Sequence, residues 1–192
     1  MKTFPEPIDL SKVRVYPLAE RHSLSARDRI LVDPAQPPRS CDAATLATIH
    51  DCAVRVAAAR EREASVILMY GAHLVKNGAM GIVNRLLEGD WVTHLATNGA
   101  GTIHDWELAF LGRTEEDVRK NVATGTFGTW AETGRCIHLA LLAGALQKEG
   151  YGRSLGRFIS EDGVILPATA SLEKALRDQP ADPLAPARAE LL

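Results

Sequence analysis

Between residues 65 and 105 the chain repeats one order of segments twice: an apolar run of strand length, a polar turn that contains glycine, and a helical pattern. The runs S-V-I-L-M-Y at 65–70 and W-V-T-H-L-A-T at 91–97 predict two buried parallel strands that are apolar on both faces. Ligands of parallel α/β sheets bind at the carboxyl ends of the strands. We therefore expect one rim to gather the polar residues that follow the two runs, which are His73, Lys76, Asn77, Thr97, Asn98, His104 and Asp105.

Composition limits the class of protein and of partner. A chain of 192 residues suits one domain with one core. Its net charge of −2 offers no basic face for nucleic acid. No apolar run reaches the roughly 18 residues of a membrane span, and we expect no signal peptide because the first residues lack an apolar core. Three cysteines without a pairing pattern fit a reducing compartment, so we expect a cytoplasmic protein.

Proline and helix signals divide the chain into three parts. We expect an extended arm over 1–42, an α/β domain over 43–166, and a C-terminal tail over 167–192 that is either frayed or docked. Helices are predicted at 43–62 with Asp42 as N-cap, 72–87, 103–111, 114–122, 130–149 ending at Gly150, and 151–160, with weaker strands at 13–16 and 164–166. Two convincing strands are too few for a stable sheet, so the chain looks like the front half of a larger α/β domain.

Two turns carry the main candidate site. In Gly71–Gly78 the first glycine lets the backbone turn sharply, and the helix amides that follow favour an anion; the alternative is an ordinary turn with a solvated Lys76. In Thr97–Asp105 two glycines, an amide and a hydroxyl suit a dinucleotide or a carboxylate ligand. His104 and Asp105 could then exchange protons with a substrate. The alternative is a tight turn over Asn98–Gly101, with Asp105 capping the next helix.

A third candidate lies in the Gly/Thr-rich segment of residues 124–134. Trp130 is predicted to form an apolar wall, and Glu132 to project from the first turn of the next helix toward a ligand. The alternative is a helix capped by threonine and a tryptophan that belongs to the core.

Metal and nucleophile chemistry have little support in the sequence. His73, His94 and His104 have neither H-x-x-x-H nor H-x-H spacing, so we expect no metal site, and His94 fits a core histidine inside a strand. The sequence has no G-x-S-x-G motif and no cysteine beside a histidine in a turn.

Three runs resemble a known family: I-L-M-Y-G-A-H-L-V-K-N-G, W-V-T-H-L-A-T-N-G-A-G-T-I-H-D and G-T-F-G-T-W-A-E-T-G-R. Over about Ser65–Arg135 the chain is similar to bacterial deoxyhypusine-synthase-like proteins, and more distantly to deoxyhypusine synthase, in which the second strand ends in T-x-A-G-G-x-x-E-D. The resemblance implies a Rossmann-like parallel sheet with flanking helices that binds NAD. It implies that the dinucleotide is lined by Gly71, Thr97, Asn98, Gly99, Ala100, Gly101 and Asp105.

The resemblance also implies chemistry and a missing part. Deoxyhypusine synthase oxidises spermidine with NAD and transfers its aminobutyl group through an imine on an enzyme lysine. That lysine and half of the cofactor site lie in a C-terminal half that this sequence lacks, as it lacks the T-D-I-x-H-M-H-P segment of longer relatives. His73 and Lys76 match the first turn of the family in position and differ in residue type. We expect a second polypeptide, or self-association, to supply the rest of the fold.

The leading hypothesis is a subunit of a deoxyhypusine-synthase-like enzyme that acts with NAD on a small amine substrate. Its catalytic residues would be His104, Asp105 and Lys76, and its substrate contacts His73, Asn77, Trp130 and Glu132. Lys76 fits a substrate or phosphate contact better than an imine-forming nucleophile, because its neighbours include no cation to activate it. Two alternatives stay open: a non-catalytic binding or regulatory subunit, and a lyase or transferase that uses His104 and Asp105 without NAD.

Overall fold

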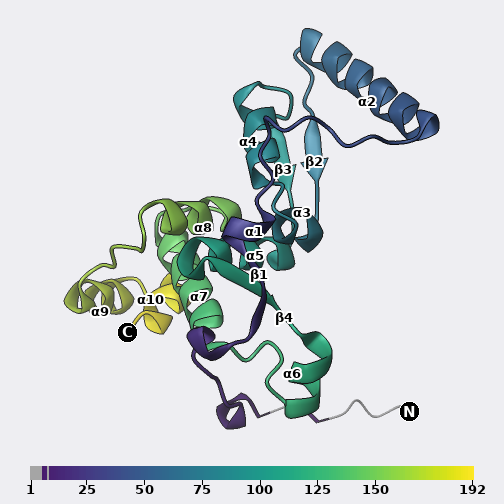
Figure 1. Cartoon of the computed structure of the whole chain (residues 1–192). Coiled ribbons are helices and arrows are strands. Elements are labelled where there is room, and N and C mark those ends of the chain that lie inside the picture. The colour runs from purple at the N-terminus through teal and green to yellow at the C-terminus, as the bar shows by residue number, and fades with distance from the viewer. Residues whose placement is uncertain (1–5, 8) are drawn as a thin grey trace, which may run out of the picture. The chain divides into compact units, whose positions relative to one another are not determined.

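The chain is a mixed α/β protein in which helices predominate (Figure 1). The computed structural model describes residues 6–7 and 9–192. The chain divides into two compact units: residues 24–115 form one, and the segment before residue 24 joins residues 116–192 in the other. In the part of the chain that the structure describes, no helix has the length and apolar character that crossing a membrane requires.

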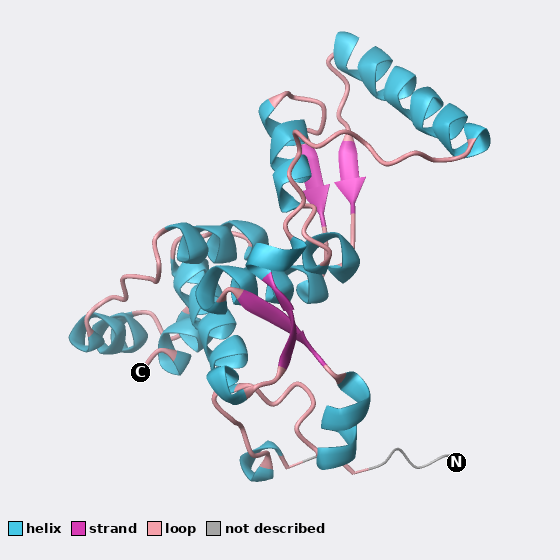
Figure 2. Cartoon of the chain, viewed as in Figure 1, coloured by secondary structure: helices cyan, strands magenta, loops and turns pink. Residues whose placement is uncertain are grey.

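The unit of residues 24–115 contains two small sheets (Figure 2). Its elements are β1 (Ser23–Ala26), α1 (Arg27–Ile30), α2 (Ala43–Glu61), β2 (Ile67–Met69), α3 (Ala72–Lys76), α4 (Met80–Glu88), β3 (His94–Ala96), α5 (Gly99–Leu111) and β4 (Arg113–Glu116), with the outermost residues of β1 and β4 assigned to the other unit. β2 and β3 run parallel with Leu68 opposite Leu95, and β1 pairs with β4. The predicted pair of parallel strands is therefore confirmed, although each strand is only three residues long.

The prediction that both strands are buried is wrong. Ile67 is 52% exposed, Met69 75% and Leu95 42%. His94, expected in the core, is exposed as well. No further strand extends this sheet among the described residues, so its side chains lack the neighbours that bury a parallel strand on both faces.

The helix predicted over 72–87 is two helices, because Gly78 interrupts it. Gly78 is buried with φ +80°, and a Cβ there would lie 1.9 Å from the carbonyl oxygen of Ile30. The Val32 N–H donates to the Gly78 oxygen at 3.0 Å. The segment before α2 thus packs against position 78 so closely that only glycine fits there. The helix is interrupted at this point, so α3 ends at Lys76 and α4 begins at Met80.

The helix predicted over 103–111 begins four residues earlier. The side chain of Asn98 accepts from the N–H groups of Ala100 and Gly101 at 3.2 and 3.4 Å, so Asn98 is the N-cap of α5. The segment expected as a tight turn is the first turn of this helix. Gly112, with φ +67°, ends it.

The other unit is helical. It contains η1 (Leu10–Lys12), η2 (Leu18–Glu20), α6 (Val118–Thr124), α7 (Ala131–Leu146), α8 (Tyr151–Ser160), α9 (Thr169–Asp178) and α10 (Ala185–Glu190). α7 packs against α8 and α10, as expected for a central packing helix. The predicted bounds of α8 are confirmed.

Two other helix boundaries differ from the sequence prediction. The single helix expected over 114–122 is the end of β4 followed by α6, with Asp117 as N-cap. α7 ends at Leu146, and Gly150, expected to end it, is the N-cap of α8.

The two ends of the chain pack more than their composition indicates. In the arm, Leu18 is fully buried, and Tyr16 exchanges backbone hydrogen bonds with Thr129 and Ala131 at 2.9 and 2.8 Å. Residues 13–16 therefore form a single bridge instead of a strand, and 164–166 form none. In the C-terminal segment Leu172 is buried and α10 contacts α7, so the docked alternative is correct there.

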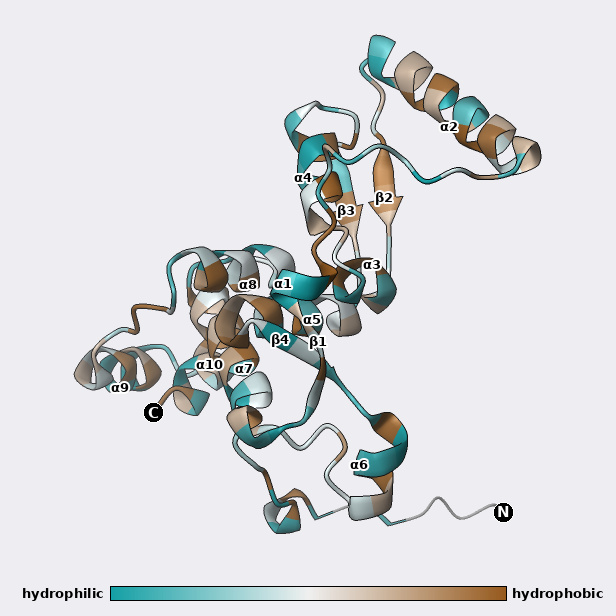
Figure 3. Ribbon diagram, viewed as in Figure 1, coloured by the Kyte–Doolittle hydropathy of each residue, from teal (hydrophilic) through white to brown (hydrophobic). Residues whose placement is uncertain are grey.

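α2 forms as predicted, and Asp42 accepts from the Thr45 N–H at 2.8 Å as its N-cap. None of its residues is buried. Apolar residues nevertheless recur along it (Figure 3), and Leu46, Ile49 and Val54 are all exposed.

The contact between α7 and α8 gives a stability test. A Cβ on Gly144 would lie 1.9 Å from Ser154 Oγ, so Gly144→Ala should lower the free energy of unfolding by about 1–3 kcal/mol through overpacking. Gly134 in the same helix has open space, and Gly134→Ala should raise it by about 0.5–1 kcal/mol through helix propensity. Urea unfolding of both variants measures the difference; equal effects would contradict the close packing of the two helices.

Candidate functional site

The carboxyl ends of β2 and β3 border an open hollow of about 520 Å³. It is lined by Met69, Tyr70, Gly71, Ala96, Thr97 and Asn98. This is the place where parallel sheets bind ligands, and three residues predicted for the cofactor, Gly71, Thr97 and Asn98, lie there together. Gly71 is the N-cap of α3, and a Cβ on it would meet no atom within 4 Å.

The amino end of α5 begins at the same edge. Asn98 already binds the Ala100 and Gly101 amides, so its side chain sits where an anion would otherwise contact them. Gly101 is buried, and a Cβ there would lie 2.4 Å from Thr97 Oγ1. The absence of a side chain at position 101 thus lets Thr97 pack closely against the helix. Packing within the protein therefore explains this glycine without a bound ligand.

Asp105 lies half-buried in the middle of α5 and is not among the residues that line the hollow, although its charge acts on Tyr70, which is. It is not the cap of this helix, since Asn98 has that role, so the capping alternative is wrong. Burial raises the pKa of Asp105. Burial also raises the pKa of Tyr70, the charge of Asp105 raises it further, and a hydrogen bond to Thr97 opposes both. Tyr70 is therefore hydrogen-bonded to Thr97 and lies within reach of the charge of Asp105, whose buried carboxyl group holds its proton to higher pH than an ordinary aspartate.

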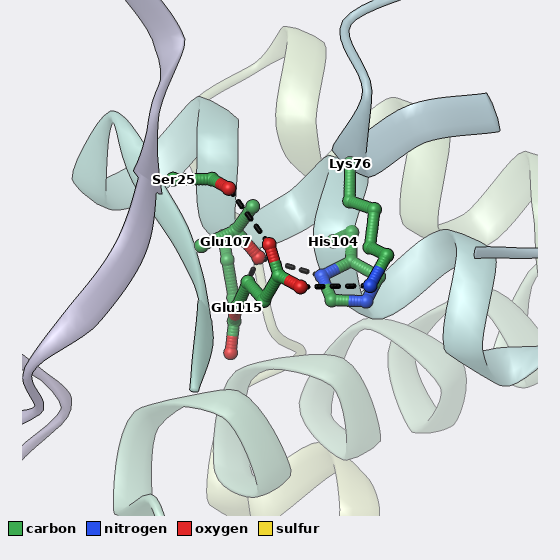
Figure 4. A network of polar contacts seen from close by, with 6 residues as sticks. Ser25, Lys76, His104, Glu107 and Glu115 are labelled. Carbon is green, nitrogen blue, oxygen red and sulfur yellow. Dashed lines mark hydrogen bonds and ion pairs between the residues drawn. The ribbon is translucent and has the colours of Figure 1, made fainter. Parts of the chain in front are cut away.

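Lys76 is the cation of an ion pair with Glu115 (Figure 4). Lys76 Nζ lies 2.7 Å from Glu115 Oε1, and the Ser25 hydroxyl donates to Glu115 Oε2 at 2.7 Å. The pKa of Glu115 is lowered, chiefly by the hydrogen bond from Lys76. Desolvation by burial raises this pKa and so opposes the shift, whereas the Ser25 hydrogen bond and the charges of Lys76 and His104 lower it further. Glu115 also has φ +67°, and left-handed backbone at a non-glycine residue costs about 1–3 kcal/mol, which these contacts offset.

His104 belongs to a chain of hydrogen bonds through Thr114 to Glu107 (Figure 4). The Thr114 hydroxyl donates to Glu107 Oε2 at 2.6 Å, and His104 Nδ1 lies 2.7 Å from the same hydroxyl oxygen. Because the single hydroxyl proton points to Glu107, Nδ1 must carry a proton and donate. In the neutral ring, Nε2 is then the nitrogen that can accept a proton, as in a base oriented by a carboxylate.

The remaining predicted site residues lie elsewhere. His73 is exposed on α3, and Asn77 is the C-cap of that helix and lines a different pocket. In the helical unit Trp130 Nε1 donates to Glu116 Oε2 at 3.0 Å, and Glu132 Oε2 accepts from the Leu18 N–H at 2.7 Å. Substrate contacts by these residues stay a prediction, and the two in the helical unit already have partners within the protein.

The structure adds residues that sequence reasoning missed: Ser25, Tyr70, Glu107, Thr114 and Glu115. One signal could have found Glu107, which follows His104 by three positions on a predicted helix and so shares its face. Glu115 lies 39 residues from Lys76, and no local pattern reports that distance.

Metal and homology searches add no further constraint. Among the described residues, no group of three His, Cys, Asp or Glu side chains could hold a metal ion. The sequence matches no protein-family model, and neither a curated protein nor a solved structure matches it.

The lowered pKa of Glu115 predicts a pH-dependent contribution to stability. A carboxylate with a depressed pKa stabilises the fold above its unfolded value of about 4.5, and this contribution disappears as pH falls through the lower folded pKa. Glu115→Gln should therefore reduce the free energy of unfolding by about 1 kcal/mol at pH 7, with the difference shrinking below pH 4.5. Denaturant unfolding at several pH values measures this, with Glu61→Gln, at an exposed residue, as the control; a constant difference would contradict the ion pair.

Proposed function

We propose that this chain is one subunit of a deoxyhypusine-synthase-like enzyme, in which NAD oxidises a small amine at a site shared with another polypeptide. The two parallel strands would belong to a Rossmann-like sheet. The observation that carries the proposal is the open hollow where both strands end, beside the T-N-G-A-G segment that starts α5. This segment belongs to one of the three runs that carry the family resemblance.

The residues at the hollow fit one part of a dinucleotide. Gly71 leaves open space at the start of α3, and Thr97 and Asn98 expose a hydroxyl and an amide beside it. Because the Asn98 oxygen caps the first amides of α5, an anionic group would meet the positive end of this 13-residue helix through the amide nitrogen of Asn98. NAD, when bound, would accept a hydride from the carbon next to the amine nitrogen. The hollow is open toward solvent, so another chain would have to supply the remaining walls.

Asp105 is the residue best suited to acid–base work here. A substrate amine is protonated near neutral pH and must lose a proton for the carbon–nitrogen bond to be oxidised. Asp105 would take this proton, because burial brings its pKa toward the range in which a general base works well. Tyr70, which feels the charge of Asp105, would be its polar neighbour on the side of the hollow.

Lys76 fits a charged contact and does not fit an imine-forming nucleophile. Its amine is taken up by the ion pair with Glu115 and is not free to attack a carbonyl carbon. A contact with a carboxylate or phosphate of the ligand would replace this pair, and His104 lies on the same side of Glu115 in Figure 4.

The need for another chain follows from exposed apolar surface. A two-stranded sheet is marginal by itself, and unpaired strand edges invite pairing. Apolar residues are exposed on both strands and on α2, namely Ile67, Met69, Leu95, Leu46, Ile49 and Val54. We propose that a second polypeptide covers them; pairing with another copy of this chain is the alternative outcome of the same purification.

One observation favours a second candidate, a lyase or transferase that works without NAD. The Glu107–Thr114–His104 chain fixes the protonated nitrogen of the imidazole, an arrangement that also serves proton transfer in reactions without a redox step. Turnover of the purified complex with and without added NAD separates the two candidates.

The cofactor is tested best at Gly71, because a side chain there meets no protein atom. In the complex with its partner, Gly71→Val should weaken NAD binding at least about tenfold, with little change in melting temperature, because the added side chain would occupy ligand space. Gly150 is the matched control: it too is an extended N-cap glycine with open space, and Gly150→Val should change neither quantity. Unchanged NAD affinity in Gly71→Val, measured by calorimetry, would overturn the cofactor assignment.

The proton-transfer role is tested at Asp105. Asp105→Asn keeps the size of the side chain and removes its capacity to take a proton, so turnover should fall about 10²- to 10⁴-fold while NAD affinity is retained. The melting temperature of the variant serves as the check on folding. Equal turnover would assign Asp105 to the core alone.

A further inference from the structure

A second pocket, of about 850 Å³, lies within the unit of residues 24–115 and shares no residue with the strand-end hollow. Its volume falls in the range of about 300–1,000 Å³ that is typical of small-molecule sites. One wall is the proline-rich segment after α1, and the other is α4 with Trp91 beyond its end. Asn77, one of the predicted substrate contacts, lines this pocket, but the proposed function at the strand-end hollow does not use it.

The proline-rich wall is held in place at two glycines, Gly78 between α3 and α4 and Gly81 in the first turn of α4. At Gly78 the backbone of Ile30 and Leu31 fills the space of a side chain, and Val32 N–H donates to the Gly78 oxygen at 3.0 Å. At Gly81 a Cβ would lie 3.0 Å from the ring of Pro34. Residues 30–34 are thus fixed against the start of α4 before any ligand arrives, which lowers the entropic cost of binding for this part of the wall.

The pocket offers a flat apolar surface. Trp91, which lines it, is 47% exposed. Its ring folds back on the end of α4, where a Cβ on Gly89 would lie 2.8 Å from Trp91 Cδ1. Ile82 and Leu86 of α4 line the same wall. An indole held in this way is suited to stacking on a planar ligand.

The charge of the pocket is positive. Arg39 and Arg85 line it, and both are exposed. Its one acidic residue, Asp33, turns a carboxylate oxygen to the Ala35 N–H at 2.8 Å and so serves the turn of its own segment. Guanidinium groups bind carboxylate and phosphate oxygens in pairs and stack on flat groups, which makes this set of residues selective for anions.

We propose that this pocket binds a small organic anion with a flat apolar body, an aromatic carboxylate or phosphate ester, whose ring stacks on Trp91 while its anionic group pairs with Arg85 and Arg39. The two anionic groups share one chemistry, because both present oxygen pairs to a guanidinium. Such a ligand would act from a site separate from the strand-end hollow. The proposal does not depend on NAD or on an amine substrate.

Tryptophan fluorescence of the full chain provides the test. Trp91 is half-exposed while Trp106 is buried, so a ligand on Trp91 should change the emission, and Trp91→Phe should remove the change. The probes are phenyl phosphate and benzoate, with benzyl alcohol as the neutral match and inorganic phosphate as the match without a ring. We expect saturable binding of at least one of the two ring-bearing anions, at least about tenfold tighter than either match.

Variants of the two arginines test whether Arg85 and Arg39 bind the anionic group of the ligand. Arg85→Gln and Arg39→Gln should each weaken binding at least about tenfold, and calorimetry with the same probes supplies a second readout. The control is Arg55→Gln, at an exposed arginine of α2 that pairs with Asp51, and it should bind as the unaltered chain does. The proposal is overturned by no saturable binding of either anion below about 10 mM, by equal binding of benzyl alcohol or inorganic phosphate, or by undiminished binding in both arginine variants.

Discussion

The close contact between Gly78 and the backbone of residues 30–31 organises much of the unit in which the candidate sites lie. It ends α3, the five-residue helix that follows β2, at Lys76. It also starts α4 in a new direction and fastens the proline-rich segment against it. A side chain at 78 would collide with backbone, which cannot move aside as the end of a flexible side chain can. The ion pair of Lys76 and the wall of the second pocket both depend on this one residue.

The polar groups of α5 and β4 show how buried charge is accommodated. Glu107 and Thr114 are both buried, and the Thr114 hydroxyl donates a hydrogen bond to Glu107 Oε2. The neighbouring Glu115 adopts left-handed backbone and is held by Lys76 and Ser25. Unpaired, such groups would cost several kcal/mol, roughly the penalty of burying a polar atom without a partner. The hydrogen bonds of His104, Thr114 and Glu107 and the ion pair of Glu115 therefore lie on α3, α5 and β4 of the same unit.

The exposed apolar residues of β2, β3 and α2 set the opposite problem. Their sequence pattern is that of buried elements, and the described residues of this chain do not bury them. Exposed hydrophobic side chains in such numbers, on the paired strands β2 and β3 and along α2, are typical of surfaces that another polypeptide covers. This is why the proposed active site is a shared one, and why the decisive measurements use the chain together with its partner.

The sequence by itself determined the features that depend on neighbours along the chain. The alternation of strand, glycine and helix predicted β2, β3 and their carboxyl ends. Asp42 predicted the start of α2, and the apolar run of residues 137–146 predicted α7. Of the seven residues predicted for one rim, Thr97 and Asn98 line the hollow, because parallel strands end on the same side of a sheet. Only the tertiary structure decided where Gly78 breaks a helix, that Asn98 caps α5, and that Glu115 meets Lys76. The first and third of these features depend on contacts between residues far apart in the sequence. The second depends on which of several possible caps is used, and a linear pattern reports neither.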